Sequence, residues 1–181
     1  LSSHGGVGFR IIDNSFDSVK SLFEPISARV PFEHAYKILS KTEDFGEIMV
    51  SEYLNEAEYS IDCLASNGKL YASIPRKKLG GRIRYLENNQ ELIEIAEKFN
   101  QTYKLPYIFN IQVRYKDGVP KLLEVNPRMS GGLNVSCLSG INFPYLAVKL
   151  LLREEITIPE PKFGILTSEI EKEIIITNAS I

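Results

Sequence analysis

Apolar and polar residues alternate with a period of two over much of the chain after residue 46, which predicts β-strands. The expected strands are 47–54, 58–65, 69–76, 107–115 and 120–126. Neighbours in this series are separated by short polar turns, so they must pair antiparallel, because a parallel partner needs a long crossover. The pattern therefore predicts an antiparallel sheet.

Two helices are expected within the same part of the chain. Apolar residues recur at helical spacing between Leu92 and Tyr103, with Asn88 or Asn89 as the N-cap. After Pro144 the segment 145–152 is apolar all round, which indicates a buried helix.

The first 46 residues have a different pattern and are expected to form a small lobe. It should hold a strand at 7–13 and short helices at 17–24 and 33–41, which Pro25 and Pro31 separate. Residues 47–181 would then form the larger lobe, whose tail, 163–176, could add one or two strands. The chain opens inside a glycine-rich stretch that normally follows a strand, so we expect a further part upstream.

Composition changes this picture little. The chain has 181 residues, 44% hydrophobic, 24% charged and 10% aromatic, and a net charge of −2. Such a balance favours neither nucleic acid nor an anionic membrane as a partner. No apolar run reaches the ~20 residues that cross a bilayer, so the cytoplasm is the expected location. Only Cys63 and Cys137 are present, and both are expected to be reduced, semi-buried small residues.

The hairpin formed by 107–115 and 120–126 carries the most informative polar residues. Glu124 and Asn126 share one strand face because they are two residues apart. A two-residue loop would place Gln112 on the opposite face from Glu124, whereas a three-residue loop, Asp117 to Val119, would pair them directly. Apolar burial favours the second alternative, since it puts Ile111, Val113, Leu123 and Val125 on one face.

Gln112, Glu124 and Asn126 then form a candidate metal site. Two carboxamide oxygens and one carboxylate suit Mg²⁺ (or Mn²⁺), which takes its remaining ligands from water and substrate phosphates. Arg128 lies two residues further on and can bind a phosphate or a carboxylate. The glycines that follow it let backbone N–H groups approach an anion.

Other residues could contribute to a nucleotide site. The loop that contains His4, Gly5 and Gly6 could fold over phosphates, although taken alone it is weak evidence and a flexible turn is favoured. Backbone groups of Glu52, Tyr53 and Leu54 could offer the donor and acceptor that an adenine edge requires, and an edge strand leading into a hairpin is the structural alternative. Glu58 could accept from ribose hydroxyls. The basic run 76–78, which contains Lys78, is expected to form a solvated turn or to line a pocket that binds an anion.

With these residues in hand, the chain resembles the ATP-grasp superfamily, and most closely the carbamoyl-phosphate synthase large-subunit group. The resemblance rests on the segments SSHGGVGFRII, MVSEYLNEAEYSIDCL, NIQVRYKDGVPKLLEVNPRMSGG and SGINFPYLAVKLLL. It implies an α+β ATP-grasp fold, an antiparallel sheet with helices on one face plus a small N-terminal lid lobe.

The resemblance also implies an activity and its residues. ATP would lie between two lobes, with adenine near Glu52, Tyr53 and Leu54 and ribose near Glu58. Its phosphates would meet two Mg²⁺ ions held by Gln112, Glu124 and Asn126, with help from Lys78. Arg128 would sit by the carboxylate substrate.

Members of this superfamily convert a carboxylate or bicarbonate to an acyl phosphate, which an amine or ammonia attacks. Small-molecule substrates and an upstream domain of the same protein are the expected partners, and a homo-oligomer is allowed. Without that domain we expect this chain to be inactive. The alternatives are an ATP-dependent phosphotransferase and a non-catalytic nucleotide-binding module.

Overall fold

A computed structural model describes residues 8–15, 19, 28–44 and 46–170. The chain divides into two compact units, Leu1–Tyr53 and Leu54–Ile181, which are described separately. The division expected from the sequence lies after residue 46, seven residues earlier. The expected helix at 17–24 lies almost wholly outside the described residues.

Among its described residues, the first unit has a two-stranded parallel sheet and one helix. Strand β1 (Ile11–Ile12) pairs with β2 (Arg29–Val30), and α1 (Phe32–Leu39) follows directly. The side chain of Asn14 accepts a hydrogen bond of 2.9 Å from the Phe32 backbone amide, which is one of the amides that a helix start leaves without a partner. The helix expected at 33–41 is therefore confirmed, whereas the expected strand is much shorter than 7–13.

The second unit is built on a six-stranded antiparallel sheet of order β7-β6-β3-β4-β5-β8. Its strands are β3 (Glu58–Ser66), β4 (Lys69–Lys78), β5 (Arg84–Leu86), β6 (Tyr107–Lys116), β7 (Val119–Asn126) and β8 (Ile165–Thr167). Both predicted hairpins, β3-β4 and β6-β7, are present, and β8 is the single strand of the described tail.

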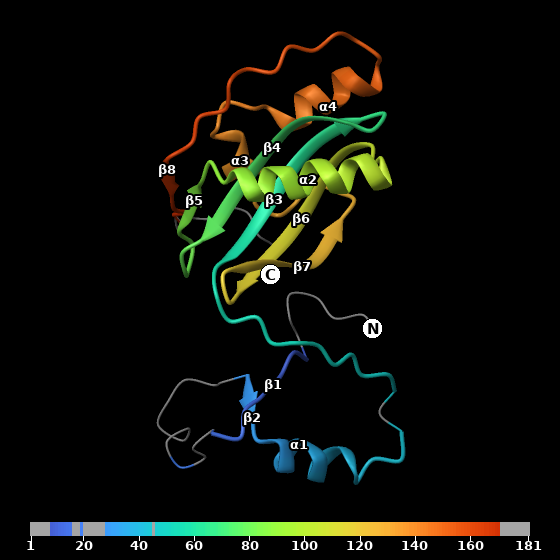
Figure 1. Cartoon of the computed structure of the whole chain (residues 1–181), viewed down its shortest axis with the longest axis vertical. Helices are drawn as coiled ribbons and strands as arrows, with labels where there is room; N and C mark the ends of the chain where they lie inside the picture. The colour runs from blue at the N-terminus through green and yellow to red at the C-terminus, as the bar shows by residue number, and fades with distance from the viewer. Residues whose placement is uncertain (1–7, 16–18, 20–27, 45, 171–181) are drawn as a thin grey trace, which may run out of the picture. The chain divides into compact units, whose positions relative to one another are not determined.

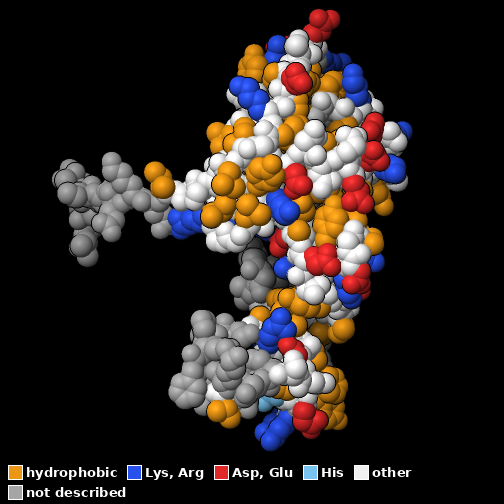
Figure 2. All heavy atoms as spheres, turned by 60° about the vertical axis from the view of Figure 1, so that its left-hand side comes forward, with side chains coloured by type: hydrophobic (Ala, Val, Ile, Leu, Met, Phe, Trp, Pro, Cys, Tyr) orange, Lys and Arg blue, Asp and Glu red, His pale blue; other side chains and the backbone are white. Residues whose placement is uncertain are grey.

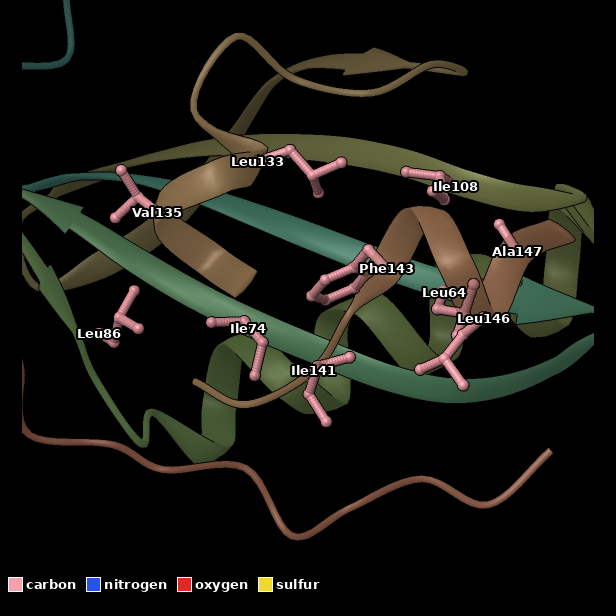
Figure 3. Packing of buried hydrophobic residues seen from close by; sticks show 10 residues of the cluster. All are labelled: Leu64, Ile74, Leu86, Ile108, Leu133, Val135, Ile141, Phe143, Leu146 and Ala147. Carbon is pink, nitrogen blue, oxygen red and sulfur yellow. The ribbon is translucent and has the colours of Figure 1, made fainter. Parts of the chain in front are cut away.

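Helices cover both faces of this sheet (Figure 1). On one face α2 (Gln90–Tyr103) places Leu92 and Ala96 against Ile61 and Phe109. On the other face α3 (Leu133–Cys137) and α4 (Phe143–Leu151) pack on the sheet through the ten residues that Figure 3 labels. The antiparallel sheet is confirmed, but the expectation of helices on one face is wrong, because side chains on both faces of the central strands are apolar and each needs a cover.

Helix α2 begins at the second of the two candidate caps. The Asn89 side chain accepts from the Leu92 backbone amide at 3.2 Å, and Asn88 is exposed. The same end of the helix meets the β6 residue Tyr115, whose hydroxyl donates to Glu91 Oε2 at 2.8 Å. Burial and this carboxylate raise the pKa of Tyr115 to about 12. Protonated Tyr115 therefore stabilises the folded state. This contribution to the free energy of unfolding is complete below the unfolded pKa near 10 and is lost as the pH rises through about 12.

Two segments differ from their predicted structure. Residues 47–54 form no strand, and Met49 and Val50 are 80% and 89% exposed, because alternation by itself supplies no partner strand. Helix α4 is present with Pro144 in its first turn, yet Tyr145, Val148 and Leu151 are exposed. It is therefore buried on one side only, and its all-round apolar sequence does not make it a core helix.

The helices of the described part were compared with the length and apolar character of a membrane span. None of its helices has the length and apolar character that crossing a bilayer requires. On the face seen in Figure 2, acidic and basic side chains are interspersed, as the small net charge suggests.

The two asparagines at the start of α2 give the first test. Asn89→Ala should lower the free energy of unfolding by about 1 kcal/mol, because the Leu92 amide loses its cap. Asn88→Ala is the matched control and should change it by less than about 0.5 kcal/mol. Urea unfolding of both variants measures the difference, and equal losses would contradict the cap assignment.

Candidate functional site

The register between β6 and β7 decides which polar side chains meet. Gln112 lies directly opposite Glu124, and Asn110 lies opposite Asn126. Partners in an antiparallel pair project from the same side of the sheet. The predicted pairing of Gln112 with Glu124 is therefore confirmed.

The physical cause of this pairing differs from the prediction. The loop has two residues, Asp117 and Gly118, with φ values of 52° and 70°, as a tight hairpin turn requires. The register then shifts between Gln112 and Val113, which leaves Leu123 as the extra residue of a β-bulge. The predicted three-residue loop is wrong, and so is the predicted burial of Leu123, which is 47% exposed.

Glu124 is the centre of the candidate metal site. Its Oε1 accepts from Gln112 Nε2 at 2.6 Å and from Asn126 Nδ2 at 2.8 Å. Rotation about the last side-chain bond would turn each carboxamide oxygen toward the point that its nitrogen now faces. One carboxylate and two such oxygens are the hard donors that Mg²⁺ or Mn²⁺ accepts, so these residues fit such an ion.

Arg128 lies next to this cluster. Its guanidinium donates to Asn126 Oδ1 at 3.2 Å and to the Met129 carbonyl at 3.0 Å, and the side chain is exposed. The structure thus brings together all four polar residues that the sequence singled out at this hairpin.

A second group of predicted residues lies one step along the same face. Glu58 is the register partner of both Lys78 and Arg114, and Arg84 is the partner of Lys78. These register partners and Lys121 form a row across the sheet in which every residue but Glu58 is basic. We call this row, Lys121, Arg114, Glu58, Lys78 and Arg84, the basic row. Lys78 forms an ion pair with Glu58, and these two residues help to line a pocket of about 440 Å³ with Arg84, Arg114 and Gly80.

The basic run 76–78 is not the solvated turn that was one of its two interpretations. It is the end of β4, so Arg76 and Lys78 share the site face while Lys77 lies on the other side. Lys78 lines the pocket, and its role toward an anion stays a prediction.

Three further polar residues of this face, Ser60, Asp62 and Asn110, are buried and were not predicted from the sequence. They are 4%, 0% and 1% exposed, and Asn110 Nδ2 donates to Ser60 Oγ at 2.9 Å and to Asp62 Oδ1 at 2.8 Å. The signal was present, because each is a polar residue at an alternate position of an apolar strand, as are Glu124 and Asn126. Alternation within one strand does not reveal that these residues meet, because that depends on the register between strands.

The remaining predicted nucleotide residues lie outside the described residues or at the boundary between the two units. His4, Gly5 and Gly6 lie outside the described residues. Glu52 and Tyr53 end the first unit and Leu54 begins the second, where it is buried. Their assignment to adenine stays a prediction.

In the described part of the chain, acidic, histidine and cysteine side chains alone form no metal site. Over the described ranges, no three or more of them lie close enough together to hold an ion. The two cysteines are free, and burial raises the pKa of Cys63 well above its usual value, followed in effect by the charge of Asp62. Cys63 is therefore an unreactive core residue.

Comparison with known proteins identifies the family. Residues 44–173 match the family described as ATP-grasp in the biosynthetic pathway with Ter operon. Because this match covers well over half of the chain, the protein belongs to that ATP-grasp family, and the expected ATP-grasp fold is confirmed. No curated protein matches the chain.

Several solved structures are similar to parts of it. They include the L-amino acid ligase from Bacillus licheniformis, at 20% identity and a TM-score of 0.44 over 56% of this chain and 30% of that one. Phosphoribosylglycinamide synthetase from Anaerococcus prevotii is 16% identical, with a TM-score of 0.48 over 68% of this chain and 36% of that one.

The ATP complex of D-alanine–D-alanine ligase from Bacillus anthracis is 18% identical, with a TM-score of 0.42 over 68% and 48%. The chain thus spans less than half the length of each of these structures. At these scores the likenesses carry no argument about activity.

The bulge gives a test of the register on which the site depends. Leu123→Ala should change the free energy of unfolding by less than about 0.5 kcal/mol, because the side chain is largely exposed. Ile111→Ala, at a fully buried neighbour, should cost about 2–5 kcal/mol. If Leu123→Ala costs as much as Ile111→Ala in thermal or urea unfolding, the hairpin has the three-residue loop instead.

Proposed function

We propose that this protein acts in an ATP- and Mg²⁺-dependent ligase, which activates a carboxylate or bicarbonate as an acyl phosphate and passes it to an amine or ammonia. The observation that carries the proposal is the convergence of Gln112 and Asn126 on one oxygen of Glu124. Membership of the ATP-grasp family supports it independently. Within that class we infer a reaction like that of the carbamoyl-phosphate synthase large subunit.

Each residue has a separate role in this scheme. Gln112, Glu124 and Asn126 would hold Mg²⁺ (or Mn²⁺), which neutralises charge on the ATP phosphates when bound. Arg128 would orient the acid through its guanidinium fork, since it reaches out from the ligand strand and is exposed. Lys78 would bind a phosphate, and Glu58 would accept from the ribose hydroxyls.

The chemistry needs positioning more than it needs an acid or a base. A carboxylate oxygen attacks the γ-phosphorus, the bond from that phosphorus to the bridging oxygen breaks, and ADP leaves with the electron pair. The amine nitrogen then attacks the acyl carbon, inorganic phosphate departs, and the nitrogen loses a proton to solvent.

The open side of the site favours partners beyond this chain. Four residues of the basic row are half-buried, and Lys121 and Arg128 are exposed, so the described residues do not enclose a substrate. We infer that an upstream domain of the same protein completes the acid pocket, with His4, Gly5, Gly6 and the segment Glu52 to Leu54 on the nucleotide. A cytoplasmic location is part of the proposal, because the reaction consumes ATP.

Substitution of the central carboxylate tests the function. The chain, joined to any upstream domain, is incubated with ATP, Mg²⁺, a panel of acids and hydroxylamine, and hydroxamate is measured. Glu124→Ala should lower the rate by at least about a hundredfold, because it removes the only charged ligand. Glu97→Ala, on the exposed side of α2 and so across the sheet from the site, is the matched control and should keep full activity.

The products separate the proposal from its alternatives. Hydroxamate with ADP supports the ligase, whereas ADP with a stable phosphorylated acceptor and no hydroxamate supports a phosphotransferase. Calorimetry that finds no Mg²⁺-dependent binding of ATP would leave a module without this chemistry and would overturn the proposal.

A further inference from the structure

The site face contains a buried ion pair that the proposed chemistry does not use. Arg76 Nη2 lies 3.3 Å from Asp62 Oδ2, and their side chains are 6% and 0% exposed. The Arg76 guanidinium also donates to Ser60 Oγ and to Ser130 Oγ, each at 3.2 Å. The pair therefore reaches from the centre of the sheet to the segment that follows β7.

Asp62 holds the other end of that segment. Its Oδ2 accepts from Ser136 Oγ in α3 at 2.6 Å, in addition to Arg76. Its Oδ1 accepts from Asn110 Nδ2. Through these bonds Arg76 and Asp62 attach both Ser130 and Ser136 to the central strands.

Gly132 lies directly against the guanidinium. A Cβ atom at this position would be 2.0 Å from Arg76 Nη1 and 2.6 Å from Cζ, so a side chain at 132 requires the buried guanidinium to move. Neither Gly131 nor Gly132 has a positive φ, and a Cβ at Gly131 would meet nothing within 4 Å. The need for glycine at 132 therefore comes from the close approach of Arg76 and not from backbone conformation.

A buried ion pair is a costly way to fill this space. Removing two charges from water costs several kcal/mol per ion, and apolar residues of similar volume are often at least as stable. The Arg76 Nε, moreover, is buried without a hydrogen-bond partner. One use of such a pair is to select a single packing of the chain, because any packing that separates the two buried charges is strongly disfavoured.

We propose that Arg76, held by Asp62, is a positioning residue that fixes the segment 127–136 on the sheet and thereby sets Asn126 and Arg128 in place. Only three residues separate Asn126, at the end of β7, from Ser130. Arg128 is the midpoint of this short bridge, and its backbone amide donates to the Asn126 carbonyl at 2.8 Å. With both ends of this bridge fixed, the Arg128 guanidinium has little freedom to move away from the candidate metal ligands Glu124 and Asn126.

This inference rests on the proposed function for its consequence, but its structural part can be tested without any activity. Gly132→Ala in the whole chain should displace the guanidinium and speed amide exchange in residues 127–136 by at least about tenfold, the change that 1.4 kcal/mol produces. Gly131→Ala is the matched control and should leave exchange in that segment unchanged, because its Cβ has open space.

A second set of variants shows whether the effect of Gly132→Ala depends on Arg76. The double variant D62N/R76A removes both charges and clears the space beside Gly132. Adding Gly132→Ala to this background should speed exchange by less than about twofold, because the clash no longer exists. An equal effect of Gly132→Ala with and without Arg76 would overturn the proposal.

The functional consequence has its own readout. Arg76→Lys keeps a positive charge near Asp62 but loses the fork that reaches Ser60 and Ser130 together. In the hydroxamate assay it should raise KM for the acid at least about tenfold, the effect of 1.4 kcal/mol, while KM for ATP changes by less than about threefold.

An equal rise in both constants would show that Arg76 binds ATP itself and would overturn the positioning role. If the unsubstituted protein forms no hydroxamate, the proposed function fails while the exchange result still decides whether Arg76 holds the segment.

Discussion

The alignment of β6 with β7 is the constraint on which the rest of the site depends. A single extra residue, Leu123, shifts the register so that Gln112 meets Glu124, and Asn110 meets Asn126. Because side chains alternate between faces, a change of one residue would send Glu124 to the opposite side of the sheet from Gln112. The exposed bulge is therefore what allows a tight two-residue turn and a facing pair of ligands to exist in the same hairpin.

The site face changes from charged to apolar along the strands. The basic row comes first, Glu124 and Gln112 follow with Ser60 and Arg76, and the next register step holds Asn126, Asn110 and Asp62. Beyond it Leu64 and Ile108 enter the core beneath α3 and α4 (Figure 3). Polar groups that would destabilise a core thus lie where a ligand can meet them. The deepest of them hydrogen-bond to one another, and only Arg76 Nε and Asn110 Oδ1 among the described residues of this face are buried without a partner.

Much of this architecture follows from local sequence. The hairpins, the helix after Asn89 and the helix after Pro144 were all predictable, since period, caps and turn residues act over a few positions. The four polar residues of the hairpin were also predictable, because they alternate on one strand end. The expected strand at 47–54 failed for the opposite reason: a strand exists only where a partner accepts its hydrogen bonds, and no alternation specifies that partner.

The sequence alone determined which residues could serve as oxygen ligands and that they would share one face of an antiparallel hairpin. Only the tertiary structure decided that helices cover both faces, that Leu123 rather than the turn sets the register, and that Arg76 and Asp62 are buried together beneath Gly132. These features depend on contacts between residues far apart in the sequence, such as Ser136 and Asp62, which are 74 positions apart. Alternation and spacing describe neighbours along the chain, whereas such contacts are fixed by how the strands and the following segment pack.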